Sequence, residues 1–294
     1  MNSTSGMKEW KKYIKTRKEL NEIFILYSNQ PWLMDRENSF IELFLLCGSI
    51  EEKQLVFELL NEFHFLEEKT LDVFLTSIAD FIINESGFEE NKTQITALTF
   101  NEEADSSQKF LDYIKMYLHK QGWNKFKTVN SFKASIEYFG KGRTQMLFID
   151  EFIGSGKTML GRLRYLKEKL KQDVDLKICF IAGIDLAIKK IEDLGYEVFC
   201  PLRLPRGISD IYVDDELELK IELMLSLEKK LAQKINEKEF SNYSFGYGKA
   251  EALYSLEGQR GNTPNSVFPI FWWPRLLDGK SRNTLLNRFE NGIE

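Results

Sequence analysis

The stretch "MLFIDEFIGSGKT", Met146–Thr158, decides how this chain is interpreted. Four apolar residues run into two adjacent acids, and a glycine-rich turn with a lysine and a threonine follows. A short apolar run that ends in a turn predicts a buried strand over 145–150. Apolar residues then recur at helical spacing over 156–172, so the whole segment predicts a strand, a turn and a helix.

Two nucleotide-triphosphate motifs share parts of this stretch, but neither fits it. A P-loop would require its first glycine at residue 151, which is Glu, and a carboxylate there would repel the phosphates. The run "LFIDE" is similar to a Walker B strand, yet no Gly-Lys-Ser/Thr precedes residue 150 to hold a triphosphate. A degenerate P-loop ATPase and an ordinary strand–turn–helix without a ligand remain the competing interpretations.

A third interpretation treats the segment as one ligand site. The amino end of a helix starting near Gly156 offers backbone N–H groups and a positive dipole end, which together bind a phosphate monoester. The hydroxyls of Ser155 and Thr158 add donors. Asp150 and Glu151, at the carboxyl end of the strand, would accept hydrogen bonds from two vicinal hydroxyls. A ribose with a 5′-phosphate presents these groups together, and ligands bind at this edge of open α/β sheets.

The same residues resemble the signature of type I phosphoribosyltransferases, from which Glu151, usually Asp, and the bulky Phe152 depart. The resemblance implies that Asp150 and Glu151 hold the ribose 2′- and 3′-hydroxyls of phosphoribosyl pyrophosphate. It also implies displacement of pyrophosphate at C1 of the ribose, with Mg²⁺ bound through the substrate. Cleavage of a nucleotide's glycosyl bond is the related alternative. The residues that would cradle the 5′-phosphate are Gly154, Ser155, Gly156, Lys157 and Thr158.

A pyrophosphate-binding turn would follow the first core strand, which is expected over 94–100. Ser106 and Ser107 stand at the start of the next expected helix, over 103–122, where they either donate to pyrophosphate or act as an ordinary N-cap. Acidic residues beside these serines would repel pyrophosphate unless magnesium intervenes. These acids are Glu102, Glu103 and Asp105.

Hydrophobic periodicity divides the chain into two expected domains. Residues 1–90 read as successive helices and predict an all-α N-terminal domain, without a convincing strand. Residues 91–294 predict a phosphoribosyltransferase-like α/β domain with an aromatic-rich C-terminal segment. Short apolar strands alternate there with helices, which predicts an open, mainly parallel sheet covered on both faces. Residues 214–238 have leucines at period two, but their length and composition favour a helix.

The C-terminal segment contains "GNTPNSVFPIFWWP", residues 261–274. Asn262 and Asn265 flank a proline in a predicted turn, where their amides either bind a substrate or only shape the turn. Trp272 and Trp273 would either stack on a ligand ring or pack as an aromatic latch at the sheet's edge. The segment resembles the end of a divergent phosphoribosyltransferase-like group from bacterial conflict systems, including retron-linked loci. That resemblance implies an antiviral defence effector with protein partners.

Composition narrows the remaining possibilities. A net charge of −5 supplies no global basic field, which disfavours a nucleic-acid substrate without excluding it. Two histidines, His64 and His119, make a His-based metal site improbable, and no protein metal site is expected. No signal peptide or transmembrane run is recognised, and the dispersed cysteines fit a reducing cytoplasm.

The sequence therefore predicts a phosphoribosyltransferase-like protein that binds a ribose 5-phosphate group. The alternative is a catalytically inactive nucleotide sensor or scaffold that uses the same pocket and holds partners through its N-terminal helices.

Overall fold

The computed structural model describes residues 17–99, 106–256 and 262–289. The chain splits into two compact units. Unit 1 combines Met1–Leu66 with Arg206–Glu294, and unit 2 is Glu67–Pro205. The expected division near residue 90 therefore differs from the observed one, because the N-terminal helices form a unit with the C-terminal segment rather than a domain of their own.

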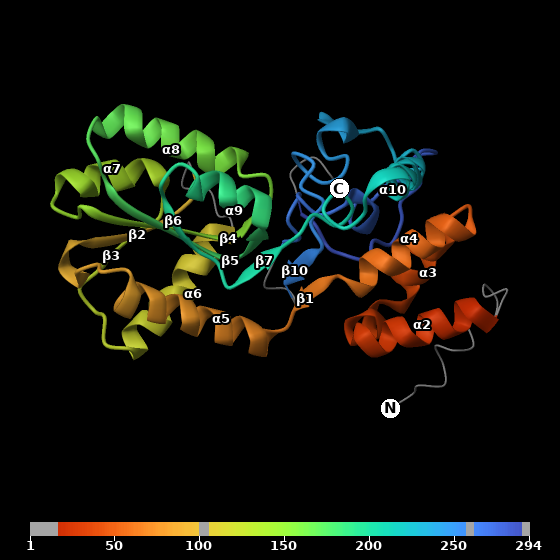
Figure 1. Ribbon diagram of the computed structural model, residues 1–294, viewed down its shortest axis with the longest axis horizontal. Coiled ribbons are helices and arrows are strands. Elements are labelled where there is room, and N and C mark those ends of the chain that lie inside the picture. The colour runs from red at the N-terminus through yellow and green to blue at the C-terminus, as the bar shows by residue number, and fades with distance from the viewer. Residues whose placement is uncertain (1–16, 100–105, 257–261, 290–294) are drawn as a thin grey trace. The chain divides into compact units, whose positions relative to one another are not determined.

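Among the described residues, unit 2 contains six parallel strands in one sheet (Figure 1). The strand order is β3-β2-β4-β5-β6, and β7 pairs with the carboxyl end of β5. This arrangement confirms the expected open parallel sheet. The strands are β2 (Thr93–Ala97), β3 (Lys127–Val129), β4 (Gln145–Ile153), β5 (Asp175–Ile184), β6 (Glu197–Phe199) and β7 (Leu202–Leu204).

Helices cover both faces of this sheet, as parallel strands require. Helices α7 and α8 lie on one face, and α5 and α6 lie on the other (Figure 1). The first helix, α5, was expected in the N-terminal domain, but its apolar stripe packs against α6 and β5. The helices are α5 (Glu68–Asp80), α6 (Ser106–Lys120), α7 (Phe132–Gly140), α8 (Lys157–Leu170) and α9 (Asp185–Glu192), with the short turns η2 (Phe81–Glu85) and η3 (Glu90–Lys92).

Strand β4 is longer than the sequence predicts. It was expected to end at residue 150, but it continues to Ile153, which pairs with Gly183 of β5. A Cβ at Gly183 would lie 2.3 Å from Cγ2 of Ile153, so the side chain of Ile153 occupies the space that a larger residue at 183 would need. The acid pair therefore lies within the strand and not after it.

Unit 1 joins the two ends of the chain through strand pairing and helix packing. Strand β1 (His64–Leu66) pairs in parallel with β10 (Tyr254–Leu256), which corrects the expectation of an N-terminal region without strands. Its helices in the N-terminal part are α2 (Arg17–Asn29), η1 (Pro31–Arg36), α3 (Glu37–Leu46) and α4 (Ile50–Asn61). In the C-terminal part they are α10 (Asp214–Glu228), η4 (Phe240–Asn242) and η6 (Pro269–Phe271).

Helices α4 and α10 pack together, and partly buried ion pairs connect α4 to α10 and to the residues just after it. Lys220 pairs with Glu58, and Lys230 pairs with Glu52, so two carboxylates of α4 are matched by two lysines of the later segment. Helix α10 ends earlier than expected. The residues that follow it turn into the short hairpin of β8 (Lys234–Ile235) and β9 (Lys238–Glu239).

The two tryptophans of the C-terminal segment are packed in unit 1. Trp272 and Trp273 are fully buried, and their indole N–H groups donate to the carbonyls of Val267 and Ala232 at 2.9 and 3.0 Å. Their rings contact each other with centroids 5.5 Å apart. Because the rings are enclosed and their N–H groups are satisfied, they do not present a face for a ligand to stack on.

The three cysteines are free thiols. Cys47 and Cys179 are buried, and Cys200 is half-buried. Within the described ranges, no helix is long and apolar enough to span a membrane.

Candidate functional site

The two acids of β4 face opposite sides of the sheet, because successive side chains of a strand alternate. Phe148, two residues before Asp150, contacts the ring of Phe132 on α7 at a centroid distance of 5.3 Å. Glu151 instead interacts electrostatically with Lys109 on α6. Asp150 therefore points to the α7 side of the sheet and Glu151 to the α6 side.

Their surroundings differ accordingly. Asp150 is half-buried, and its Oδ1 accepts the N–H of Glu151 at 2.8 Å. Glu151 is only 5% exposed, and its Oε1 has no hydrogen-bond partner among the described residues. Burial and, to a smaller extent, the charge of Asp150 raise the pKa of Glu151 to about 8 against the opposing effect of Lys109. A carboxyl with such a pKa is protonated at neutral pH, which avoids an unpaired buried charge.

The glycine turn leads directly from β4 into α8. Gly156 is the N-cap of α8 and has φ +77°, a left-handed conformation that favours glycine. As an N-cap it supplies no side-chain acceptor for the amide groups of the first helical turn. Lys157 and Thr158 are exposed, Ser155 is half-buried, and Gly154 is buried. The turn therefore has the backbone geometry of an anion-binding helix terminus, with exposed polar side chains beside it.

Helix α9 forms the wall behind this turn. A Cβ at Gly156 would lie 3.5 Å from Cβ of Ala187 and 3.6 Å from its carbonyl oxygen, which is ordinary contact. Only the backbone conformation, and not crowding, selects glycine at this position.

The expected pyrophosphate turn falls largely outside the described residues. Glu102, Glu103 and Asp105 lie there, as does the side chain of Ser106, the first residue of α6. Ser107 is buried, and its hydroxyl accepts the N–H of Thr99 at 3.2 Å. In the described part of this turn, the Ser107 hydroxyl therefore bonds to the backbone of Thr99.

The two asparagines belong to unit 1, whereas the acid pair and the glycine turn belong to unit 2. The side chain of Asn262 holds Phe289 through both of its polar atoms. Its amide N–H donates to the carbonyl of Phe289, and its Oδ1 accepts the N–H of Phe289 at 2.7 Å. At Asn265 the backbone carbonyl accepts the N–H of Tyr247 at 2.8 Å, and the residue is half-exposed. Asn262 therefore has a structural role.

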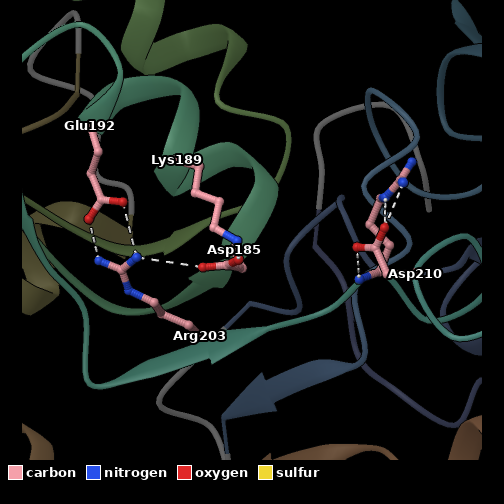
Figure 2. A network of polar contacts seen from close by, with 6 residues as sticks. Asp185, Lys189, Glu192, Arg203 and Asp210 are labelled. Atoms are coloured by element: carbon pink, nitrogen blue, oxygen red, sulfur yellow. Dashed lines mark hydrogen bonds and ion pairs between the residues drawn. The ribbon is translucent and has the colours of Figure 1, made fainter.

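A charged network near the turn was not anticipated from the sequence. Arg203 of β7 contacts Asp185 and Glu192 of α9, and Lys189 contacts Asp185 (Figure 2). The available signal in the sequence was an apolar run followed by an acid, which occurs at Asp185 after β5 as it does at Asp150 in β4. Lys109 carried no such signal, because a single exposed lysine on an amphipathic helix is ordinary.

Parallel strand order, helices on both faces and a strand–turn–helix with terminal acids define unit 2 as a fold of phosphoribosyltransferase type. A family model described as PRTase-CE matches residues 48–288. Since this range covers well over half of the sequence and includes parts of both units, the chain belongs to the PRTase-CE family, which is of phosphoribosyltransferase type. The searches of curated proteins and of solved structures found no match.

Proposed function

We propose that unit 2 binds the ribose 5-phosphate group of phosphoribosyl pyrophosphate or of a nucleotide. The observation that carries the proposal is the Gly156 turn, which places the amino end of α8 directly after the acids of β4. A phosphate monoester fits such a terminus, since the N–H groups and the dipole both favour an anion. Ser155, Lys157 and Thr158 would add polar contacts to the phosphate, and Gly154 would let the backbone approach it.

Asp150 would accept hydrogen bonds from the ribose hydroxyls. Its half-buried carboxylate lies a few residues before the phosphate turn, at the carboxyl end of β4. Glu151 lies on the opposite face of β4 and would not share this ribose with Asp150; its Oε1, which has no hydrogen-bond partner among the described residues, can accept one more hydrogen bond on that face. Neither asparagine is part of this proposal for unit 2, because both belong to unit 1, and the side-chain polar atoms of Asn262 are bonded to Phe289.

In the proposed reaction the bond between C1 of the ribose and the pyrophosphate oxygen breaks, and a bond from C1 to the acceptor forms. Pyrophosphate leaves with the bonding electrons, and the acceptor loses its proton. The protein would act mainly by positioning these groups and by excluding water. Mg²⁺, bound through the substrate's phosphate oxygens, would neutralise charge on the leaving group. Across the described residues, no three His, Cys, Asp or Glu side chains gather into a metal-binding group.

A non-catalytic nucleotide sensor or scaffold is the second candidate. It is favoured by the placement of the acid pair on opposite faces of β4, since two such carboxylates do not converge on one ribose. A sensor would bind the same ligand without turnover.

The first experiment is calorimetric titration of phosphoribosyl pyrophosphate and of ribose 5-phosphate, with Mg²⁺, into wild type and Asp150→Asn. Glu168→Gln is the matched control, because Glu168 is an exposed acid on the last part of α8. We expect Asp150→Asn to lose at least tenfold in affinity, as a charged hydrogen bond is worth about 1.5–3 kcal/mol. If wild type binds neither ligand, the proposed ribose 5-phosphate site is refuted. Pyrophosphate or base release then separates the enzyme from the sensor.

We also propose a role in antiviral defence, with partners held by the helices of unit 1. This proposal rests on the resemblance of the C-terminal segment to proteins of bacterial conflict systems. Phage plating on bacteria that express the gene together with its neighbouring genes tests it. Equal plating on cells with wild type and with Asp150→Ala/Glu151→Ala would contradict a defence function of this pocket.

A further inference from the structure

The network of Arg203, Lys189, Asp185 and Glu192 lies at the same edge of the sheet as the proposed phosphate turn. Gly183 of β5 pairs with Ile153, the residue that precedes the turn, and Asp185 follows two residues later. Helix α9, which begins at Asp185, also backs Gly156 through Ala187. With a rise of about 1.5 Å per helical residue and strands about 4.8 Å apart, Asp185 lies on the order of 10 Å from the turn.

A carboxylate at that distance opposes the binding of a phosphate dianion. Like charges roughly 10 Å apart are only partly screened at moderate ionic strength. Asp185 therefore works against the ligand that the turn is proposed to hold, unless its charge is balanced.

The structure balances Asp185 with two cations. Nζ of Lys189 lies 2.6 Å from Oδ2 of Asp185, and Nη1 of Arg203 lies 3.5 Å from Oδ1 (Figure 2). Arg203 is held in place from its other side, because its guanidinium also pairs with Glu192 at the last turn of α9. Arg203 and Asp185 are each about one-third exposed, at 34% and 32%, whereas Lys189 is 63% exposed. Arg203 is thus the less exposed of the two cations and has a second carboxylate partner.

We propose that Arg203 is a positioning residue that shields the charge of Asp185 and so permits a phosphate group to bind at the turn of residues 154–158. The inference rests on the proposed function, since it concerns the affinity of the same turn. Arg203 acts through Asp185 and does not itself touch the ligand. Asp185 in turn stabilises the amino end of α9, where an acid interacts favourably with the helix dipole.

The test is a double-mutant cycle with ribose 5-phosphate as the probe, measured by calorimetry at low ionic strength. Arg203→Met should weaken binding about three- to tenfold, the effect expected from the loss of one of the two positive charges that balance Asp185 near a dianion. Asp185→Asn in the Arg203→Met background should restore the affinity to within about twofold of wild type, because the two substitutions remove opposite charges. Arg203→Lys should retain part of the wild-type affinity because it keeps the charge.

Two controls separate shielding from a general structural effect. Lys177→Met removes another ion pair of the same sheet, that of Lys177 with Glu197, in the amino-terminal half of β5. It should leave the affinity for ribose 5-phosphate unchanged. The loss caused by Arg203→Met should also shrink as salt is added, because exposed charges are then screened.

The outcomes separate the proposed ribose 5-phosphate site from the proposed role of Arg203. Wild type that does not bind ribose 5-phosphate would refute the proposed site and this inference with it. If wild type binds but Arg203→Met has no effect, only the shielding is refuted. The same holds if the loss persists at high salt and Asp185→Asn does not rescue it, since Arg203 would then have a purely structural role.

Discussion

Replacing Glu151 by glutamine tests whether this carboxyl is protonated in the folded protein. Burial raises the pKa of Glu151 to about 8, from an ordinary value of 4.5. Between these two pH values the folded state binds one more proton than the unfolded state at this residue. The stability of wild type therefore falls as the pH rises through this interval, and the loss is complete above pH 8.

The magnitude follows from the width of the interval. At about 1.36 kcal/mol per pH unit, ionising Glu151 costs the folded state on the order of 4 kcal/mol between about pH 5 and pH 8. Glutamine has nearly the same shape but does not titrate. We expect the free energy of unfolding of Glu151→Gln to rise relative to wild type by about this amount across the interval.

Urea denaturation of both proteins at a series of pH values between about 5 and 9 measures this difference. The control is Glu168→Gln, which replaces an exposed acid of α8. A constant difference between Glu151→Gln and wild type across the series would refute the reasoning. It would mean that Glu151 is solvated or paired in solution.

Three further predictions concern stability and binding. Gly156→Ala should cost about 1 kcal/mol in urea denaturation and weaken ribose 5-phosphate binding, because alanine is strained at φ +77°; unchanged stability would exclude that conformation. Asn262→Ala should cost about 1–2 kcal/mol through its lost bonds to Phe289 while leaving ligand affinity unchanged, and an affinity loss would make Asn262 a substrate contact after all. Burial raises the pKa of Glu228 from 4.5 to about 7, so ionisation of this carboxyl destabilises the fold as the pH rises through that range. The free energy of unfolding of Glu228→Gln should therefore depend less on pH there than that of wild type. An identical pH dependence would contradict the raised pKa.

Local patterns predicted most of unit 2. The apolar run before Asp150 gave a buried strand, and Gly156 gave the turn into a helix, since both depend on neighbouring residues only. A local pattern also predicts the start of α4 in unit 1, where Glu52 follows Ser49 by three residues, the spacing of a helix N-cap. The hydroxyl of Ser49 accepts the N–H of Glu52 at 3.1 Å.

The local structure of the segment that carries the candidate site was predicted, but its geometry was not. Residues 150–158 were recognised as one segment, and the structure keeps them in one strand–turn–helix. The extension of β4 to Ile153 was not predictable, because it results from pairing with β5. That extension puts Asp150 and Glu151 on opposite faces and gives them different exposures. Arg203 was missed for the same reason, since it meets Asp185 only after β7 pairs with β5.

The sequence by itself determined the type of each long element, the parallel sheet and the segment that carries the acids and the glycine turn. These features depend on periodicity and on the conformational preferences of single residues, which are local properties of the chain. Tertiary structure decided the division into units, because β1 pairs with β10 across nearly two hundred residues and α5 packs on the sheet. An amphipathic helix or a short strand shows that it must bury a face, but its partner is selected only when the whole chain has folded.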